Sequence, residues 1–322
     1  MPNPVASLPA VSVIVPNYNH SRFLSARFKS ILSQTYRGFE IVVLDDCSTD
    51  DSVRCIESLL ETTPHVLLKN VTNSGSPFSQ WLRGIQASKG QYIWIAESDD
   101  ISLPDFLETA MNSFADGANF FYCRNSSIDE YGRNLKWPFW GDGLNPKWFK
   151  KDFVMTGNEF VARFMANRNV IPNASAVVFD RSLLRIDPSV LSMKYAGDWL
   201  IWSLMLNSQD VTLHYSAKEM DCHRCHASSS REELSKAKVL QRIREAVIVF
   251  TAVNRMVGAS YCCLLRRCWH SDLSWLRHQL WREIRLRGFI NVVFPLVRVG
   301  PIGVALTVAV MSERFYEKMK LV

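Results

Sequence analysis

"VSVIVPNYNHSRFLSARFKSILSQTYRGFEIVVLDD" (residues 11–46) holds two short apolar runs on either side of a stretch with helical periodicity. The runs at 11–18 and 39–46 are rich in Val and Ile, which is typical of strands buried on both faces. Residues 21–34 repeat apolar side chains at the spacing of one face of a helix. A strand, a helix and a second strand in this order predict two parallel neighbours in one sheet.

The same alternation continues to about residue 123. Further strands are expected at 65–70, 91–98 and 119–123, and further helices at 50–61, 77–88 and 103–114. We therefore predict an α/β fold, with a Rossmann-like, mostly parallel sheet flanked by helices, in a domain that spans residues 1–235. A helical extension is expected to follow at residues 236–322.

Length and composition place the chain among globular proteins. Of its 322 residues, 48% are hydrophobic and 21% are charged, a balance that excludes disordered and fibrous classes. The apolar run near the N-terminus reads as a strand and has no basic segment before it, unlike a secretory signal. We therefore expect the protein in the cytoplasm.

The segment "DCHRCHASSS" (221–230) contains the spacing Cys222-x-x-Cys225-His226, which is found in c-type haem attachment sites and in half of a zinc knuckle. No second pair of ligands accompanies it, and covalent haem attachment normally takes place outside the cytosol. Reduced, packed thiols are the expected state of the eight cysteines. Haem and zinc stay as alternatives.

Polar and acidic residues follow three of the predicted strands, in "PNYN", "DDCSTDDS" and "ESDD". Ligands of parallel sheets bind at these carboxyl ends. The chain has no glycine-rich phosphate loop, so carboxylates would face a phosphate, and a divalent Mn²⁺ or Mg²⁺ would have to lie between them. Glu97 and Asp99 are placed to hold it. Simple helix-capping loops are the alternative interpretation of these acidic segments.

"VSVIVPNYN", "SILSQTYRGFEIVVLDDCSTDDS" and "GIQASKGQYIWIAESDD" together resemble the GT-A fold glycosyltransferases of family 2, and the resemblance runs from about Val11 to about Ser230. It implies an inverting transferase that uses a nucleotide-diphosphate sugar, commonly UDP-linked, with Mn²⁺ or Mg²⁺ as its cofactor. The expected acceptor is a hydroxyl of a glycan or of a lipid-linked molecule, and no nucleic acid partner is expected.

The resemblance also implies roles for residues at the strand ends. Pro16 and Tyr18 would lie against the nucleobase, with the Tyr ring as a stacking face. Asp45 and Asp46 occupy the position of a paired Asp motif, and Asp46 is favoured as the acceptor of a base N–H, which would select uracil over purines.

"ESDD" occupies the position of the family's metal-binding Asp-x-Asp motif. Asp99 is the expected principal ligand, Glu97 replaces the first Asp, and Asp100 would reach the sugar or a ligating water. The Arg-x-His motif at Arg224 and His226 would add a cation beside the diphosphate and a third metal ligand.

"YAGDWLIWSLML" (195–206) matches the family segment that carries the general base, which identifies Asp198 as the candidate. Inverting transfer needs such a base, because the acceptor hydroxyl loses a proton as it attacks the anomeric carbon. Gly197 stands where many relatives have a second acid. Trp199 and Asn173 are expected on the acceptor side. The alternative role of Asp198 is to cap the helix at 199–206.

The C-terminal part is basic. Residues 240–322 hold 13 Lys and Arg against 5 Asp and Glu, and "LSWLRHQLWREIRLRG" (273–288) is an amphipathic pattern with Arg on its polar face. Such helices suit an anionic membrane surface, so peripheral attachment to the inner face is our hypothesis; packing on the catalytic domain is the alternative. "VGPIGVALTVAVM" (299–311) is too short to span a bilayer.

Two other classes of protein stay open. A processive polysaccharide synthase would carry several membrane spans and a Gln-x-x-Arg-Trp motif, which "QLWR" (279–282) does not match. A catalytically inactive nucleotide-sugar-binding or scaffold protein would share the fold and the nucleotide site.

Overall fold

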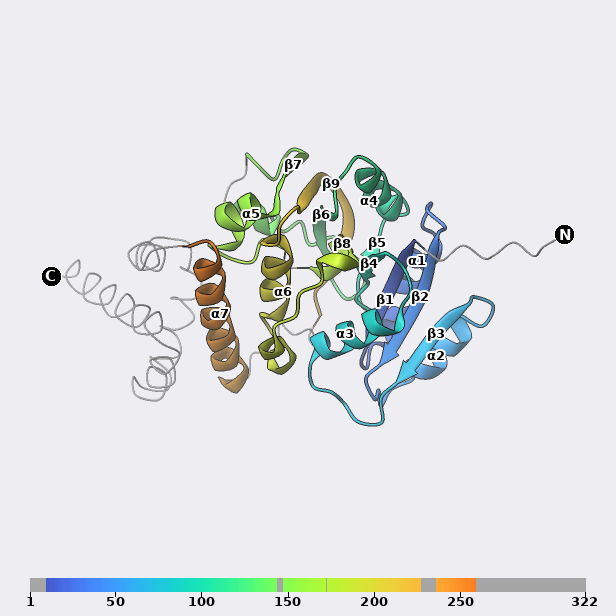
Figure 1. The fold of residues 1–322 in the computed structure, drawn as a ribbon. Coiled ribbons are helices and arrows are strands. Elements are labelled where there is room, and N and C mark those ends of the chain that lie inside the picture. Colours follow the sequence, from blue (N-terminus) through green and yellow to red (C-terminus); the bar gives the residue numbers. More distant parts are fainter. Residues whose placement is uncertain (1–9, 144–146, 172, 227–235, 259–322) are drawn as a thin grey trace.

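The computed structural model of the protein describes residues 10–143, 147–171, 173–226 and 236–258 (Figure 1). Its strands are β1 (Val11–Asn17), β2 (Phe39–Asp45), β3 (His65–Lys69), β4 (Tyr92–Ile95), β5 (Ile101–Ser102), β6 (Phe120–Ile128), β7 (Phe153–Thr156), β8 (Val177–Asp180) and β9 (Thr212–Arg224). Its helices are α1 (Ser21–Leu32), α2 (Ser52–Leu59), α3 (Pro77–Ala87), α4 (Phe106–Ala115), α5 (Gly157–Phe160), α6 (Gly197–Leu206) and α7 (Lys236–Met256).

One sheet runs through the molecule in the order β3-β2-β1-β4-β8-β6-β9-β5, with β7 paired to β9 (Figure 1). The first four strands are parallel, as the alternating strands and helices of the sequence predict. Asn17 at the end of β1 is in register with Asp45 at the end of β2. The polar segments that follow these strands therefore leave the sheet at the same edge.

Beyond β4 the sheet is mixed, and the parallel pairing of the first four strands does not continue. The strand expected at 119–123 is β6, and it does not pair with β4, because β8 lies between them and is antiparallel to both. The long strand β9 runs parallel to β6, and the short strands β5 and β7 run antiparallel to β9. Apolar periodicity is a local signal and carries no information on which strands become neighbours.

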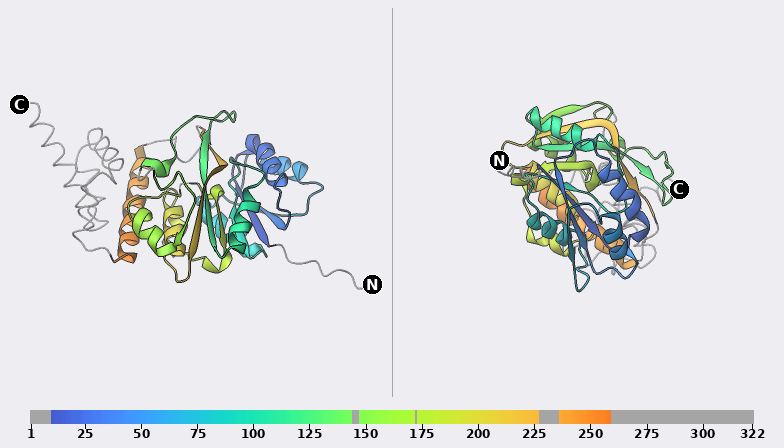
Figure 2. Two further views of the ribbon diagram at one scale, coloured as in Figure 1. Left: turned by 90° about the horizontal axis from the view of Figure 1, so that it is seen from above. Right: turned by 90° about the vertical axis from the view of Figure 1, so that its right-hand side faces the viewer.

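Close packing fixes α3 on the sheet at Gly84. A Cβ atom added there would lie 2.4 Å from the Ile14 side chain and 2.7 Å from the Leu44 side chain. The absence of a side chain at this position thus lets the helix approach β1 and β2 directly. The N-terminus of α3 is held at the same edge of the sheet as the ends of these strands (Figures 1 and 2).

α7 lies against α6 (Figure 1). Its buried face consists of Ile243, Ala246, Val247, Val249, Phe250 and Val253, which belong to the same hydrophobic core as the sheet. The helix predicted at the start of the C-terminal extension is therefore present, and it shares the core of the preceding domain. Residues 273–288 and 299–311, with the predicted membrane attachment, lie outside the described residues. None of the described helices combines the length and the apolar character that a bilayer crossing requires.

Candidate active site

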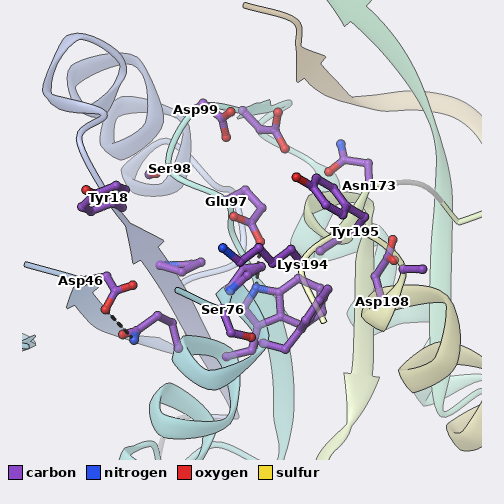
Figure 3. Close-up of a pocket in the computed structure, with 18 of the residues that line it drawn as sticks. Tyr18, Asp46, Ser76, Glu97, Ser98, Asp99, Asn173, Lys194, Tyr195 and Asp198 are labelled. Carbon is purple, nitrogen blue, oxygen red and sulfur yellow. Dashed lines mark hydrogen bonds between the residues drawn. The ribbon is translucent and has the colours of Figure 1, made fainter. Parts of the chain in front are cut away.

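A cavity of about 750 Å³ opens at the carboxyl ends of β1 and β4, between the N-terminal ends of α3 and α6. Nine of the residues predicted for the site line it: Pro16, Tyr18, Asp46, Glu97, Asp99, Asp100, Asn173, Asp198 and Trp199. Asp45, Arg224 and His226 are not among the lining residues. Figure 3 shows Tyr18 and Asp46 at one end of the cavity and Asp198 at the other.

At the Tyr18 end, an aromatic face and a carboxylate stand together. Tyr18 is 45% exposed, so its ring is open to stacking. The Asp46 carboxylate is held in place by Ser74, which donates from its backbone N–H and its hydroxyl (both 2.8 Å), and by Gln80 Nε2 (3.0 Å). The sequence analysis did not predict Gln80 as a site residue, because a polar residue in a helical pattern carries no sign that it faces a cavity.

Asp45 has a different role from Asp46. Its carboxylate accepts hydrogen bonds from Asn17 Nδ2 (2.8 Å) and from the Ser48 backbone N–H (2.9 Å) and hydroxyl (2.6 Å). These bonds tie the end of β1 to the turn after β2. Of the two adjacent aspartates, Asp46 is thus the one that faces the cavity.

A three-residue cluster with metal-ligand chemistry lies at the upper edge of the cavity. His20 from the start of α1, Asp99 from the loop after β4 and His226 from the end of β9 each place one ligand atom within 4.8 Å of the other two. His226 Nε2 lies 2.9 Å from Asp99 Oδ2. His20 was missed in the sequence, although it directly follows the polar end of β1. Cys222 and Cys225 do not belong to this cluster.

The electrostatics of the cluster suit a cation. Burial by itself would raise the pKa of the Asp99 carboxyl, but the hydrogen bond with His226 and the nearby His20 and His223 rings hold it below its usual range. Burial lowers the pKa of His20, which favours the neutral imidazole that binds metals. The set therefore offers one ionised carboxylate and imidazole nitrogens.

Glu97 points away from this cluster. Its Oε1 accepts a hydrogen bond from the indole N–H of Trp81 (2.8 Å). Burial and the neighbouring Asp99 and Asp100 carboxylates raise the pKa of Glu97 to about 8, so the neutral acid is favoured at pH 7. The structure thus directs Glu97 to Trp81 on α3, whereas Asp99 lies in the cluster with the two histidines.

Asp100 and Arg224 hold the loop after β4 against β9. Asp100 accepts hydrogen bonds from the Ser175 hydroxyl (2.7 Å) and from the Arg224 backbone N–H (2.9 Å). The Arg224 guanidinium donates to the backbone carbonyls of Asp99 (2.6 Å) and Asp129 (3.0 Å). In this arrangement Arg224 supports the backbone of Asp99 from behind the cavity.

A second layer of buried charge, absent from the predictions, lies beneath the site. Arg27 is fully buried and donates to the Ser102 hydroxyl (3.0 Å), which in turn donates to Asp221 (2.9 Å). The other Asp221 oxygen accepts from Asn173 Nδ2 (2.5 Å). Burial raises the pKa of Asp221 well above its ordinary value, and Arg27 opposes that effect. This chain of contacts fixes Asn173 at the cavity wall.

At the opposite end, Asp198 lies in the first turn of α6. Its Oδ2 accepts a hydrogen bond from Asn169 Nδ2 (2.9 Å). The helix N-terminus favours an ionised carboxylate at this position. Trp199 packs beside it and donates its indole N–H to the Met165 carbonyl (2.9 Å), so it forms part of the wall. Lys194 and Tyr195 line the cavity just before α6 (Figure 3).

A sheet whose parallel half opens a polar, acidic cavity at its strand ends has the architecture of the GT-A class of glycosyltransferases. Within that class, residues 12–171 match the family model described as Glycosyl transferase family 2, and this part of the chain belongs to that family.

Individual relatives agree with this assignment. Glycosyltransferase GlyG of Streptococcus pneumoniae is 36% identical over 99 residues, which are 31% of this chain and 33% of that protein. The GalNAc(5)-diNAcBac-PP-undecaprenol beta-1,3-glucosyltransferase of Campylobacter jejuni is 30% identical over 210 residues, 64% of this chain and 63% of that enzyme. The chain thus spans between a third and two thirds of the length of these two relatives.

A solved structure shows the same fold. The crystal structure of S. aureus TarS residues 1–349 in complex with UDP-GlcNAc superimposes with a TM-score of 0.63 at 16% identity, over 94% of this chain and 91% of that one. The likeness extends through the mixed half of the sheet, beyond the residues that match the family model.

Proposed function

We propose that this protein is an inverting glycosyltransferase that moves a sugar from a nucleotide-diphosphate donor, UDP-linked, to a hydroxyl of a glycan or lipid-linked acceptor. One observation carries the proposal. A single cavity joins an exposed aromatic ring and a carboxylate at Tyr18 and Asp46, a carboxylate–imidazole cluster around Asp99, and a separate aspartate, Asp198, at its far end. A donor with its diphosphate beside the cluster would present its sugar toward Asp198.

The reaction follows from this arrangement. Tyr18 stacks on the base, and Asp46 accepts the base N–H. Asp198 accepts the proton of the acceptor hydroxyl while the acceptor oxygen forms a bond to the anomeric carbon and the bond from that carbon to the diphosphate oxygen breaks. The attack and the departure take place on opposite faces of the sugar, so the configuration inverts. Asn169 keeps the Asp198 carboxylate oriented for the proton transfer.

The ligand atoms in the cluster fit a divalent transition metal. Asp99 supplies a hard oxygen, whereas His20 and His226 supply imidazole nitrogens, which Mg²⁺ rarely accepts and first-row metals accept readily. A divalent ion held there supplies positive charge that stabilises the departing diphosphate. We therefore favour Mn²⁺ over Mg²⁺ as the cofactor.

This choice of metal gives a prediction. After treatment with EDTA, transfer activity is expected to return with Mn²⁺ at a metal concentration about tenfold or more below that needed with Mg²⁺, because two of the three ligands are imidazoles. Metal titrations of initial rate at fixed donor concentration check this. Replacing His20 with Ala should bring the activating concentrations of Mn²⁺ and Mg²⁺ closer together. Equal half-saturating concentrations of the two ions in the unaltered protein would contradict the assignment of Mn²⁺ to this cluster.

The nucleotide site gives a second prediction. UDP is expected to bind more tightly than GDP, and Asp46→Asn is expected to weaken UDP binding about tenfold or more, because a charged acceptor for the base N–H is lost. Calorimetric titration with UDP, GDP and dTDP in the presence of metal measures both effects. A donor-hydrolysis screen then identifies the sugar.

The matched control is Asp51→Asn, an exposed carboxylate in the turn that follows Asp46. It removes the same charge without touching the cavity. If both variants weaken UDP binding equally, the weaker binding results from the lost negative charge in general. The assignment of Asp46 as the acceptor of the base N–H would then be wrong.

A further inference from the structure

Two hydrogen-bonding contacts run from α7 to two segments that adjoin Asp198. The first is made by Glu245, whose side chain is 5% exposed. Its carboxylate accepts hydrogen bonds from the backbone N–H groups of Lys194 (3.0 and 3.1 Å), Tyr195 (2.7 Å) and Ala196 (3.1 Å). These groups lead into the first turn of α6, and Ala196 is its N-cap residue, where backbone N–H groups have no partner within the helix.

The second contact is made by Asn254, which is fully buried nearer the C-terminal end of α7. Its Nδ2 donates to the carbonyl of Ala166 (2.8 Å), which ends the helical segment η2 (Val161–Met165). Three residues further on, Asn169 donates to Asp198 Oδ2 (2.9 Å). One contact therefore holds the backbone that carries Asp198, and the other holds the segment that carries the partner of its carboxylate.

We propose that Glu245 and Asn254 are positioning residues for the reaction, acting through the orientation of Asp198. The proposal rests on the role of Asp198 as general base under the proposed function. A carboxylate that accepts several N–H bonds forms strong, directional contacts, and a buried amide that bonds to a carbonyl is equally fixed in geometry. Displacing a catalytic group by about 1 Å can cost about 100-fold in rate.

The composition of α7 distinguishes the positioning role of Glu245 and Asn254 from packing of the helix on the core. Apolar side chains such as Val247, Phe250 and Val253 supply the buried contact of the helix with the core. Glu245 is the one acidic residue between Lys236 and Met256, and it lies on the same buried face. Arg242 and Ala246, on the same helix, line the cavity itself. The residues that line the cavity therefore include two from α7, which follows the boundary predicted at residue 235.

The test uses the full-length chain with Mn²⁺. Glu245→Gln keeps the shape and one acceptor oxygen but removes the charge, and Asn254→Leu keeps the volume but removes the amide. Each is expected to lower kcat about 10- to 100-fold, while the KM for the donor and the Kd for UDP change by less than about twofold. Glu245→Asp, which retains the charge, is expected to recover part of kcat.

Arg244→Ala is the matched control, because Arg244 is exposed beside Glu245 on the same helix. It should leave kcat and KM unchanged. A smaller fraction of folded protein would also lower the apparent kcat, so the melting temperature of each variant must first show that folded protein is compared. In folded protein, a disturbed cavity would change KM and UDP affinity as well, whereas a loss confined to kcat indicates a misplaced Asp198. If Glu245→Gln does not fold, Glu245→Asp and Asn254→Leu are compared in the same way.

The outcomes separate this inference from the proposed function. If Asp198→Asn abolishes transfer while Glu245→Gln and Asn254→Leu retain the kcat of the unaltered protein, the inference is wrong and the proposed function stands. A parallel loss of UDP affinity and kcat in the folded α7 variants also overturns the inference. If Asp198→Asn itself retains full turnover, the proposed function is wrong, independently of the α7 variants.

Discussion

Replacing Asp198 with Asn is expected to lower kcat for glycosyl transfer about 10²- to 10⁴-fold, with the Kd for UDP changed by less than about twofold. The amide cannot accept the proton of the acceptor hydroxyl, yet it has nearly the same shape and can still bond to Asn169. Asp198 lies at the end of the cavity opposite Tyr18 and Asp46, so the nucleotide site is expected to be untouched (Figure 3). Single-turnover transfer assays and UDP titrations measure the two quantities.

Asp116→Asn is a suitable control for Asp198→Asn, because Asp116 is exposed at the end of α4. It should transfer sugar at the rate of the unaltered protein. Full activity of the Asp198 variant would contradict its role as the base. If the unaltered protein binds UDP but turns over none of the donors offered, the alternative of an inactive nucleotide-sugar-binding or scaffold protein is favoured instead.

The second large effect is expected at Asp99. Asp99→Asn should weaken Mn²⁺ binding and lower kcat/KM about 10²- to 10³-fold, because it removes the one carboxylate of the His20–Asp99–His226 cluster and the charge that balances the cation. The lowered pKa of Asp99 keeps this group ionised throughout the neutral range, so the loss should persist from pH 6 to 8. Metal titration by calorimetry and initial rates measure the effect.

Glu97→Gln provides the comparison for Asp99→Asn, two residues away in the same loop. Its amide oxygen can still accept the hydrogen bond from Trp81, and Glu97 points away from the cluster. We therefore expect a much smaller loss of Mn²⁺ affinity than in Asp99→Asn. An equal loss in the two variants would show that Glu97 is a metal ligand, as the Asp-x-Asp position first suggested.

Much of the proposed donor site could be predicted from the sequence, because its signals are local. Apolar runs that end in "PNYN" and "ESDD" locate strands and their termini, and parallel strands present their termini at one edge. This reasoning brings Tyr18, Asp46 and Asp99 to one cavity without a structure. The pairing of β6 with β8 and β9 is not local, so the strand expected at 119–123 could be located from the sequence but its neighbours could not.

The sequence by itself determined the parallel half of the sheet and the chemical character of its edge, since these depend on residues close together in the chain. Only the tertiary structure decided which side chain faces which. His20 and His226 are 206 residues apart in the chain and lie together beside Asp99. Glu97 is hydrogen-bonded to Trp81. Of the adjacent aspartates, Asp46 lines the cavity and Asp45 does not. The tertiary structure also placed Glu245 at the start of α6, where three N–H groups need an acceptor. Contacts of this kind depend on how helices pack on the sheet, and no spacing in the sequence records them.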